Sequence, residues 1–166
     1  MFISLFFIII LLVILTFVWP PDSPWSPWWR TSKAVAKSAC RLASISKNDV
    51  VYELGSGDGE FILAAAKDFS ASKAIGIEID HSRYLVSVVK KRIRGVHNAF
   101  FIRSDFKKVN LSDATVVYLY LVPAVIKRIL PKLKKELRPG TRVVSYRYKM
   151  PLSHGKKSGE LYFYKI

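Results

Sequence analysis

The distribution of apolar and polar residues divides the chain into one long apolar run and a series of shorter ones. Residues 2–19 carry no charge, and only Ser4 and Thr16 are polar. The shorter runs are rich in Val, Ile, Tyr and Phe, and they predict strands at residues 50–54, 73–79, 98–103, 114–121, 141–148 and 159–166. Amphipathic stretches predict helices at residues 32–45, 60–68, 82–94 and 123–137. Within the last stretch, Pro131 is expected to begin a second short helix.

Strands that alternate with helices in this way indicate crossover connections and a mostly parallel sheet. We therefore expect an α/β fold, with a Rossmann-like doubly wound sheet of six or seven strands. Three segments are predicted: a transmembrane helix at residues 1–19, a Pro/Trp linker at 20–30 and a folded domain at 31–166. Thr31 or Ser32 is expected to cap the first helix of that domain.

The apolar run of residues 2–19 is close in length to a membrane span. As a helix it would rise about 27 Å, against a bilayer core of about 30 Å. Pro20 and Pro21 would end the helix, and the Trp residues that follow suit the headgroup level. A cleaved signal peptide is the main alternative, but no Lys or Arg precedes the run and no small-residue cleavage site follows it.

Charge is placed unevenly along the chain. The formal net charge is +15, yet Asp22 is the only charged residue among the first 29. The first basic residues, Arg30 and Lys33, follow the apolar run, which predicts a cytoplasmic or equivalent location for the folded domain. A basic surface attracts anionic lipid, nucleic acid or an acidic protein. Anionic lipid is expected ahead of nucleic acid, because no separate nucleic-acid-binding module is visible.

Residue types that would indicate metal or disulfide chemistry are sparse. Cys40 is the single cysteine, so the chain has no internal disulfide and no zinc site built on cysteine pairs. Its Ala-rich helical surroundings predict a small buried apolar residue. The three histidines are scattered without metal-ligand spacing, and we predict no metal site.

The segment ELGSGDG, residues 53–59, carries the strongest chemical signal. It leaves the first predicted strand and enters a helix, where its glycines permit a tight turn and close approach of a ligand. A dinucleotide-binding loop has the spacing G-x-G-x-x-G, whereas here it is G-x-G-x-G. Carboxylates at Glu53, Asp58 and Glu60 would repel a pyrophosphate. They suit a cationic ligand, and S-adenosylmethionine (SAM) carries both an ammonium and a sulfonium.

Further acidic residues follow the next two strands. Glu78 ends the second strand and is predicted to accept the ribose hydroxyls of a nucleoside. After the third strand, Asp105 is predicted to accept the adenine amino group and Phe106 to pack on the ring. The alternative for Asp105 is a loop carboxylate that caps a backbone turn. With these residues, six acids follow three consecutive strand ends: Glu53, Asp58, Glu60, Glu78, Asp80 and Asp105.

ELGSGDG, GIEID and SDF resemble the first three cofactor motifs of class I, seven-β-strand SAM methyltransferases. That resemblance implies SAM as cofactor and Gly55, Ser56, Gly57, Asp58 and Gly59 as its loop, with Glu53, Glu78, Asp105 and Phe106 around it. The finer similarity is to membrane-anchored and archaeal protein-lysine methyltransferases, including those acting on the adenine nucleotide translocase and on the c-subunit of ATP synthase. It rests on PWSPWWRT, ELGSGDG, VVYLYLVP and LPKLKKELRPGTRVVSYRY.

The resemblance implies methyl transfer to a lysine amine of a membrane or membrane-adjacent protein. Tyr120 stands where this fold places its acceptor-facing motif, so we predict that it lines the acceptor site. Tyr118 lies on the same side of the strand, but deeper, and is expected to be a core tyrosine. The group usually has Asp where Glu53 stands. Only PLSHGKKS separates the last two predicted strands, so the usual edge hairpin is expected to be shortened, and the presence of its edge strand decides between six and seven strands.

Other functions stay open at this point. The acceptor is alternatively a small molecule, a lipid headgroup or RNA. The Asn/Asp-Pro-Pro-Tyr motif of enzymes that methylate adenine or glutamine amino groups is absent, which disfavours a nucleobase acceptor. A non-catalytic binding module with a SAM-type fold is the third alternative, although an intact glycine loop together with Glu78 argues against it.

Overall fold

The computed structural model describes residues 2–18 and 29–166, and in the first helix it describes the side chains of residues 4–13. The chain forms two compact units, Met1–Arg30 and Thr31–Ile166. Most of the predicted Pro/Trp linker, with Trp25 and Trp28, lies outside the described residues, as does Trp19 at the end of the predicted transmembrane segment.

The first unit contains helix α1, Phe2–Val18. The large apolar side chains from Leu5 to Val13 are all exposed. Among the described residues, no helix has both the length and the apolar character needed to cross a membrane. The predicted helix is therefore confirmed, whereas its prediction as a transmembrane helix is not supported.

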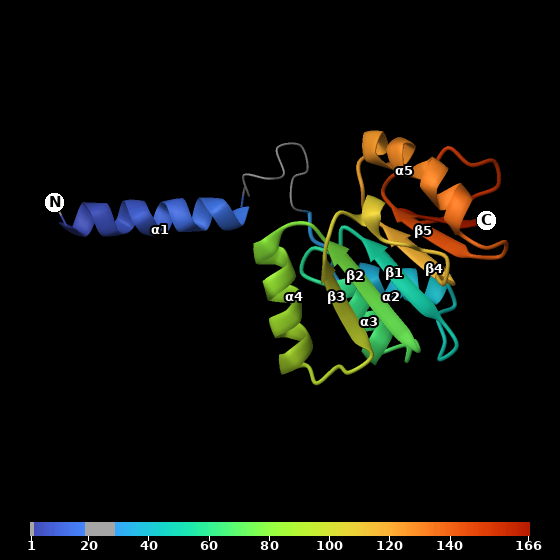
Figure 1. Ribbon diagram of the computed structural model, residues 1–166, viewed down its shortest axis with the longest axis horizontal. Helices are drawn as coiled ribbons and strands as arrows, with labels where there is room; N and C mark the ends of the chain where they lie inside the picture. Colours follow the sequence, from blue (N-terminus) through green and yellow to red (C-terminus); the bar gives the residue numbers. More distant parts are fainter. Residues whose placement is uncertain (1, 19–28) are drawn as a thin grey trace. The chain divides into compact units, whose positions relative to one another are not determined.

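The second unit is built on a seven-stranded sheet with the order β3-β2-β1-β4-β5-β7-β6 (Figure 1). Strands β1 to β5 run parallel, and β7 pairs antiparallel with both β5 and β6. The strands are β1 Val50–Leu54, β2 Lys73–Glu78, β3 Ala99–Arg103, β4 Val116–Leu119, β5 Arg142–Tyr146, β6 Lys156–Ser158 and β7 Leu161–Lys165. The predicted α/β fold with a mostly parallel sheet is confirmed.

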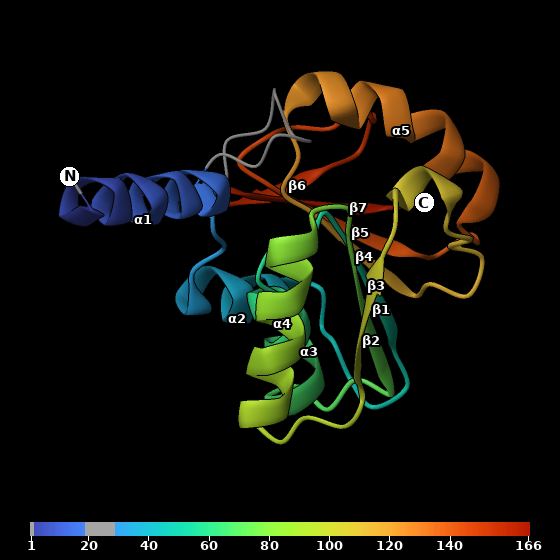
Figure 2. The same cartoon turned by 60° about the vertical axis from the view of Figure 1, so that its left-hand side comes forward.

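Helices cover both faces of this sheet (Figure 2). One face carries α2 Lys33–Leu42, α3 Glu60–Lys67 and α4 His81–Ile93, and the other carries α5 Pro123–Glu136 and the short 3₁₀ helix η1 Phe106–Lys108. Each face buries its own apolar cluster, because the apolar and aromatic residues of β1 and β4 alternate between the two sides. Cys40 is buried in the cluster under α2 and α3, as predicted.

One local prediction is wrong. Pro131 lies inside the single helix α5 and does not begin a second one. Ile126, Ile129 and Leu133 are all buried against the sheet, and this packing keeps the helix continuous past the proline. The edge strand that the sequence left open is present as β6, whose three residues pair with the start of β7, so the sheet has seven strands. The hairpin is short, as expected, and Ser32 caps α2 by accepting a hydrogen bond from the Val35 N–H.

Candidate functional site

The strand order places β1 between β2 and β4, at the point where the chain changes direction across the sheet. Ligands of open α/β sheets bind outside the carboxyl ends of the strands at such a point. The chain there forms the loop of residues 55–59, between the end of β1 and the start of α3. The glycine motif found in the sequence therefore occupies the position that this fold uses for ligands.

Two features of this loop favour glycine: the left-handed backbone conformation and the close contact with Phe101. Gly55, Gly57 and Gly59 all have positive φ angles, of 78°, 53° and 76°. A Cβ atom on Gly59 would lie 2.4 Å from the Phe101 ring. The Gly55 and Ser56 N–H groups both donate to the Ile77 carbonyl at 2.9 Å, which ties the loop to the end of β2.

Three buried carboxylates surround the loop. Glu53 comes from β1, Asp58 from the loop itself and Glu78 from the end of β2. The Glu78 carboxylate accepts hydrogen bonds from the Gly57 N–H at 2.7 Å and from the Asp80 N–H at 2.9 Å. Burial raises the pKa of Glu53 well above its usual value, and the nearby charges of Asp58 and Glu78 raise it further. The arrangement favours a positively charged ligand over an anionic one.

Two polar atoms of the loop region support a fit to SAM. Within the described part of the chain, Glu53 Oε2 and Ser56 Oγ are buried and have no hydrogen-bond partner. Leaving such atoms unpaired is costly, and a polar ligand that supplies partners offsets this cost. Together with the three carboxylates, they fit a nucleoside that carries an ammonium group and hydroxyls.

Two of the six acidic residues noted in the sequence make contacts that stabilise the fold. Glu60 forms ion pairs with Lys90 at 2.7 Å and with Arg94 at 2.9 Å, and both partners belong to the α4 region. Burial alone would raise the pKa of Glu60, but hydrogen bonds from Arg94 and Lys90 outweigh it and lower the pKa to about 2. Asp80 caps α4 by accepting a hydrogen bond from the Arg83 N–H at 2.8 Å.

Asp105 and Phe106 follow β3, and the structure shows a local role for each. Asp105 accepts a hydrogen bond from the Lys107 N–H at 2.9 Å and caps η1, which matches the alternative interpretation from the sequence. Phe106 packs in part against the apolar cluster on the α5 face. Their predicted contacts to adenine stay a prediction.

The acceptor-facing prediction concerns Tyr120, which follows the end of β4. Its ring meets the Tyr146 ring, from the end of β5, edge to face at a centroid distance of 4.6 Å. Tyr118 is fully buried and stacks on Phe61 with ring centroids 4.1 Å apart, so it is a core tyrosine as expected. Sequence reasoning missed Tyr146 and its neighbours Arg147 and Glu160, although aromatic residues at the end of a predicted strand were a visible signal.

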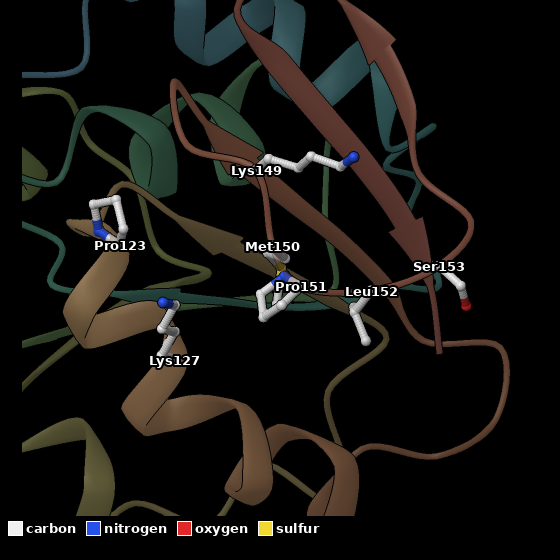
Figure 3. Close-up of a pocket in the computed structure, with 7 residues that line it drawn as sticks. All are labelled: Pro123, Lys127, Lys149, Met150, Pro151, Leu152 and Ser153. Carbon is white, nitrogen blue, oxygen red and sulfur yellow. The ribbon is translucent and has the colours of Figure 1, made fainter.

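A cavity of about 520 Å³ lies between the start of α5 and the segment that follows β5 (Figure 3). It is lined by Pro123, Lys127, Lys149, Met150, Pro151, Leu152 and Ser153. None of the glycine-loop residues lines it, so this cavity is separate from the predicted cofactor site. Across the described residues, no three His, Cys, Asp or Glu side chains gather to hold a metal ion.

Comparison with known proteins decides which family has this site. The profile of the ANTKMT methyltransferase domain matches residues 53–157, from Glu53 through the loop to β6. The chain belongs to this family. Family membership confirms the resemblance noted in the sequence, and the chain is a SAM-dependent methyltransferase.

Individual relatives of this ANTKMT-family chain differ in how much of their length they share with it. A protein-lysine N-methyltransferase of Saccharolobus islandicus is 40% identical over 130 residues, which cover 76% of this chain and 80% of that protein. An adenine nucleotide translocase lysine N-methyltransferase of Mus musculus is 35% identical over 104 residues, covering 61% of this chain. The match spans only 44% of the mouse protein, a little under half its length.

A solved structure also supports the assignment as a SAM-dependent methyltransferase. The crystal structure of an RNA methyltransferase from Salinibacter ruber in complex with S-adenosyl-L-homocysteine matches with a TM-score of 0.76 and 33% identity. The match covers 82% of this chain and 92% of that chain. The cofactor prediction is confirmed: ANTKMT-family methyltransferases use SAM, which supplies a methyl group on a sulfonium centre.

Proposed function

We propose that this chain transfers the methyl group of SAM to the side-chain amine of a lysine in a protein. The observation that carries the proposal is the buried carboxylate cluster of Glu53, Asp58 and Glu78 around the glycine loop. It stands on the same sheet edge as the aromatic pair at the ends of β4 and β5. Relatives named as lysine N-methyltransferases support the choice of acceptor.

Each site residue has a role in this proposal. Glu53 and Asp58 face the ammonium group of the cofactor, and Glu78 accepts hydrogen bonds from its ribose hydroxyls. Asp105 and Phe106 hold the adenine ring. The cofactor lies against the backbone of the loop residues Gly55, Ser56, Gly57 and Gly59.

The acceptor side needs little chemistry from the protein beyond position and protonation state. A lysine amine attacks only after its ammonium has lost a proton, and partly buried surroundings favour the neutral form. Tyr120 offers such surroundings at the end of β4, because it packs in part against the apolar cluster under α2 and α3. Holding donor and acceptor in line supplies much of the remaining rate enhancement.

The test is methyl transfer from SAM with a radiolabelled methyl group. The full chain is added to a membrane fraction, and labelled protein is hydrolysed and separated by amino-acid analysis. Methyl-lysine is the expected product, and a Gly57→Arg variant serves as the inactive control. Label recovered in small molecules or lipid but absent from protein would overturn the lysine acceptor, and no transfer at all would favour a non-catalytic binding module.

RNA is the second candidate acceptor. The matched Salinibacter ruber structure is named an RNA methyltransferase, and the net charge of +15 suits a polyanion. Nuclease treatment separates the two candidates, because label in RNA is released by ribonuclease and label in methyl-lysine is not.

A membrane location, with the catalytic domain on the cytoplasmic side, stays a prediction from the sequence. It rests on the uncharged residues 2–19 and on the basic residues Arg30 and Lys33 that follow them. Contact of the basic surface with anionic lipid belongs to the same prediction. Alkaline carbonate extraction tests the anchor, and release of the full-length chain into the supernatant would refute it.

A further inference from the structure

Four side chains form a compact cluster at the carboxyl ends of β4 and β5: Tyr120, Tyr146, Arg147 and Glu160. The two tyrosine rings meet at 4.6 Å with an interplanar angle of 61°. The Arg147 guanidinium carbon lies 5.9 Å from the centroid of the Tyr120 ring and 5.4 Å from that of Tyr146. A cation at such distances from aromatic faces is attracted by the charge distribution of the rings.

Glu160 holds this arrangement together from the turn before β7. Its carboxylate accepts a hydrogen bond from the Tyr146 hydroxyl at 3.1 Å and lies 3.4 Å from Arg147 Nε. Its carbonyl accepts a hydrogen bond from the Arg147 N–H at 2.7 Å. The cluster therefore consists of two aromatic faces and one carboxylate around one cation.

The backbone of Arg147 is strained. Its φ angle is 64°, a left-handed conformation that is uncommon for a residue with a long side chain. Strain of this kind gathers at functional sites and is maintained by surrounding contacts. The side chains of Arg147 and Glu160 are 41% and 61% exposed, so their ion pair is open to competition from another cation.

A lysine ammonium would use the same partners as the guanidinium. We propose that Tyr120, Tyr146 and Glu160 form the site at which the acceptor lysine first binds as its ammonium, before it loses a proton to solvent and becomes the attacking amine, and that Arg147 occupies this site until the substrate displaces it. This inference rests on the proposed lysine acceptor. In this inference Arg147 competes with the substrate ammonium and so lowers its affinity, and Glu160 recognises the substrate's positive charge.

The experiment uses n-butylammonium, which has the same four-carbon amine as a lysine side chain. Its binding to the full chain is followed by NMR of ring-labelled tyrosines. In the Arg147→Gly variant, binding at Tyr120 and Tyr146 is expected to be at least about threefold tighter than in the wild type, because the competing cation is gone. Glycine also suits the positive φ angle at this position. In that background, Glu160→Gln is expected to weaken binding by about threefold.

Matched controls separate this effect from general changes in charge. Lys157→Ala removes another cation, which lies 5.5 Å from the Tyr162 ring, and should leave n-butylammonium binding unchanged. The neutral ligand n-butanol should not shift the Tyr120 and Tyr146 signals. Arg147→Asn provides a second variant that tolerates the left-handed conformation and should also tighten binding.

Equal or weaker n-butylammonium binding in both Arg147 variants would overturn the inference. Failure of this inference can be distinguished from failure of the proposed function. Methyl-lysine formed by a wild type whose Arg147 variants bind the amine no better would refute the inference alone. Label found in RNA would refute the lysine acceptor, whatever the amine binding shows.

Discussion

At the scale of single residues, the site depends on carboxylates that the protein keeps out of water. Glu53 is the most deeply placed, and its raised pKa means that the ligand-free protein holds a proton there at pH values at which an exposed glutamate has lost it. A cationic ligand favours the ionised form, so binding of SAM is coupled to release of that proton.

The first prediction follows from this coupling. SAM affinity should rise as the pH is raised from the ordinary glutamate pKa of 4.5 towards neutral pH, because less free energy is spent on deprotonating Glu53. A Glu53→Gln variant should bind more weakly at the upper end and lose most of the pH dependence. Titration calorimetry at several pH values measures both effects. An unchanged pH profile in the variant would show that Glu53 is not the coupled group.

Gly76 gives the second prediction at this scale. A Cβ atom there would lie 2.7 Å from both the Phe101 ring and Ser56 Oγ, so β2 can pass under the loop only without a side chain. Gly76→Ala should lower the free energy of unfolding by about 1–3 kcal/mol through overpacking. Urea denaturation measures the change. A midpoint equal to that of the wild type would mean that Phe101 moves aside at no cost.

At the scale of elements, ion pairs connect α4 to the start of α3. Lys90 contacts both Asp58 and Glu60, and Arg94 contacts Glu60 through two hydrogen bonds. Since Asp58 belongs to the loop, these contacts link the position of α4 to the cofactor site. Apolar packing contributes less here, because Arg83 and Ser87 are the buried residues of α4.

Glu60→Gln is therefore expected to destabilise the fold at neutral pH by about 1–3 kcal/mol, the usual range for hydrogen bonds to charged groups. Because its folded pKa is lowered, the stability from Glu60 is present above the ordinary pKa of 4.5 and is lost as the pH falls towards about 2. The variant should lose less stability over that range, and urea denaturation at several pH values measures the difference.

Lys37→Gln, which breaks the exposed pair with Asp68, is the control and should change stability by under about 1 kcal/mol. Equal effects of the two substitutions would contradict a special role for Glu60.

The elements also show what the sequence can and cannot predict. All the parallel strands and the α-helices of the second unit were predictable, because each has an apolar run or face of the right period, whereas the short η1 was not. Strand β6 was not, since Lys156, Lys157 and Ser158 show no apolar alternation and pair only because β7 lies beside them. Pro131 suggested a break, whereas burial of the α5 face keeps the helix continuous.

At the scale of the whole second unit, the strand order brings distant residues together. The proximity of Glu53 and Glu78 to the glycine loop was predictable, because each lies near the end of a strand beside the glycine motif and parallel strands place those ends on one edge. The cluster around Arg147 was not predictable in this way. Glu160 reaches Tyr146 through an antiparallel pairing, and a positive φ angle at Arg147 has no signature in the sequence.

The central claim is that the glycine loop and its carboxylates bind SAM, and calorimetric titration tests it most directly. The wild type should bind SAM in a saturable way, and Gly57→Arg should abolish binding by placing a long side chain where the cofactor is proposed to lie. Gly95→Arg is the matched control, because Gly95 also has a positive φ angle but has open space around it. The account predicts lost binding in the first variant and intact binding in the second. Saturable binding that survives Gly57→Arg, or a wild type that binds no SAM, would contradict it.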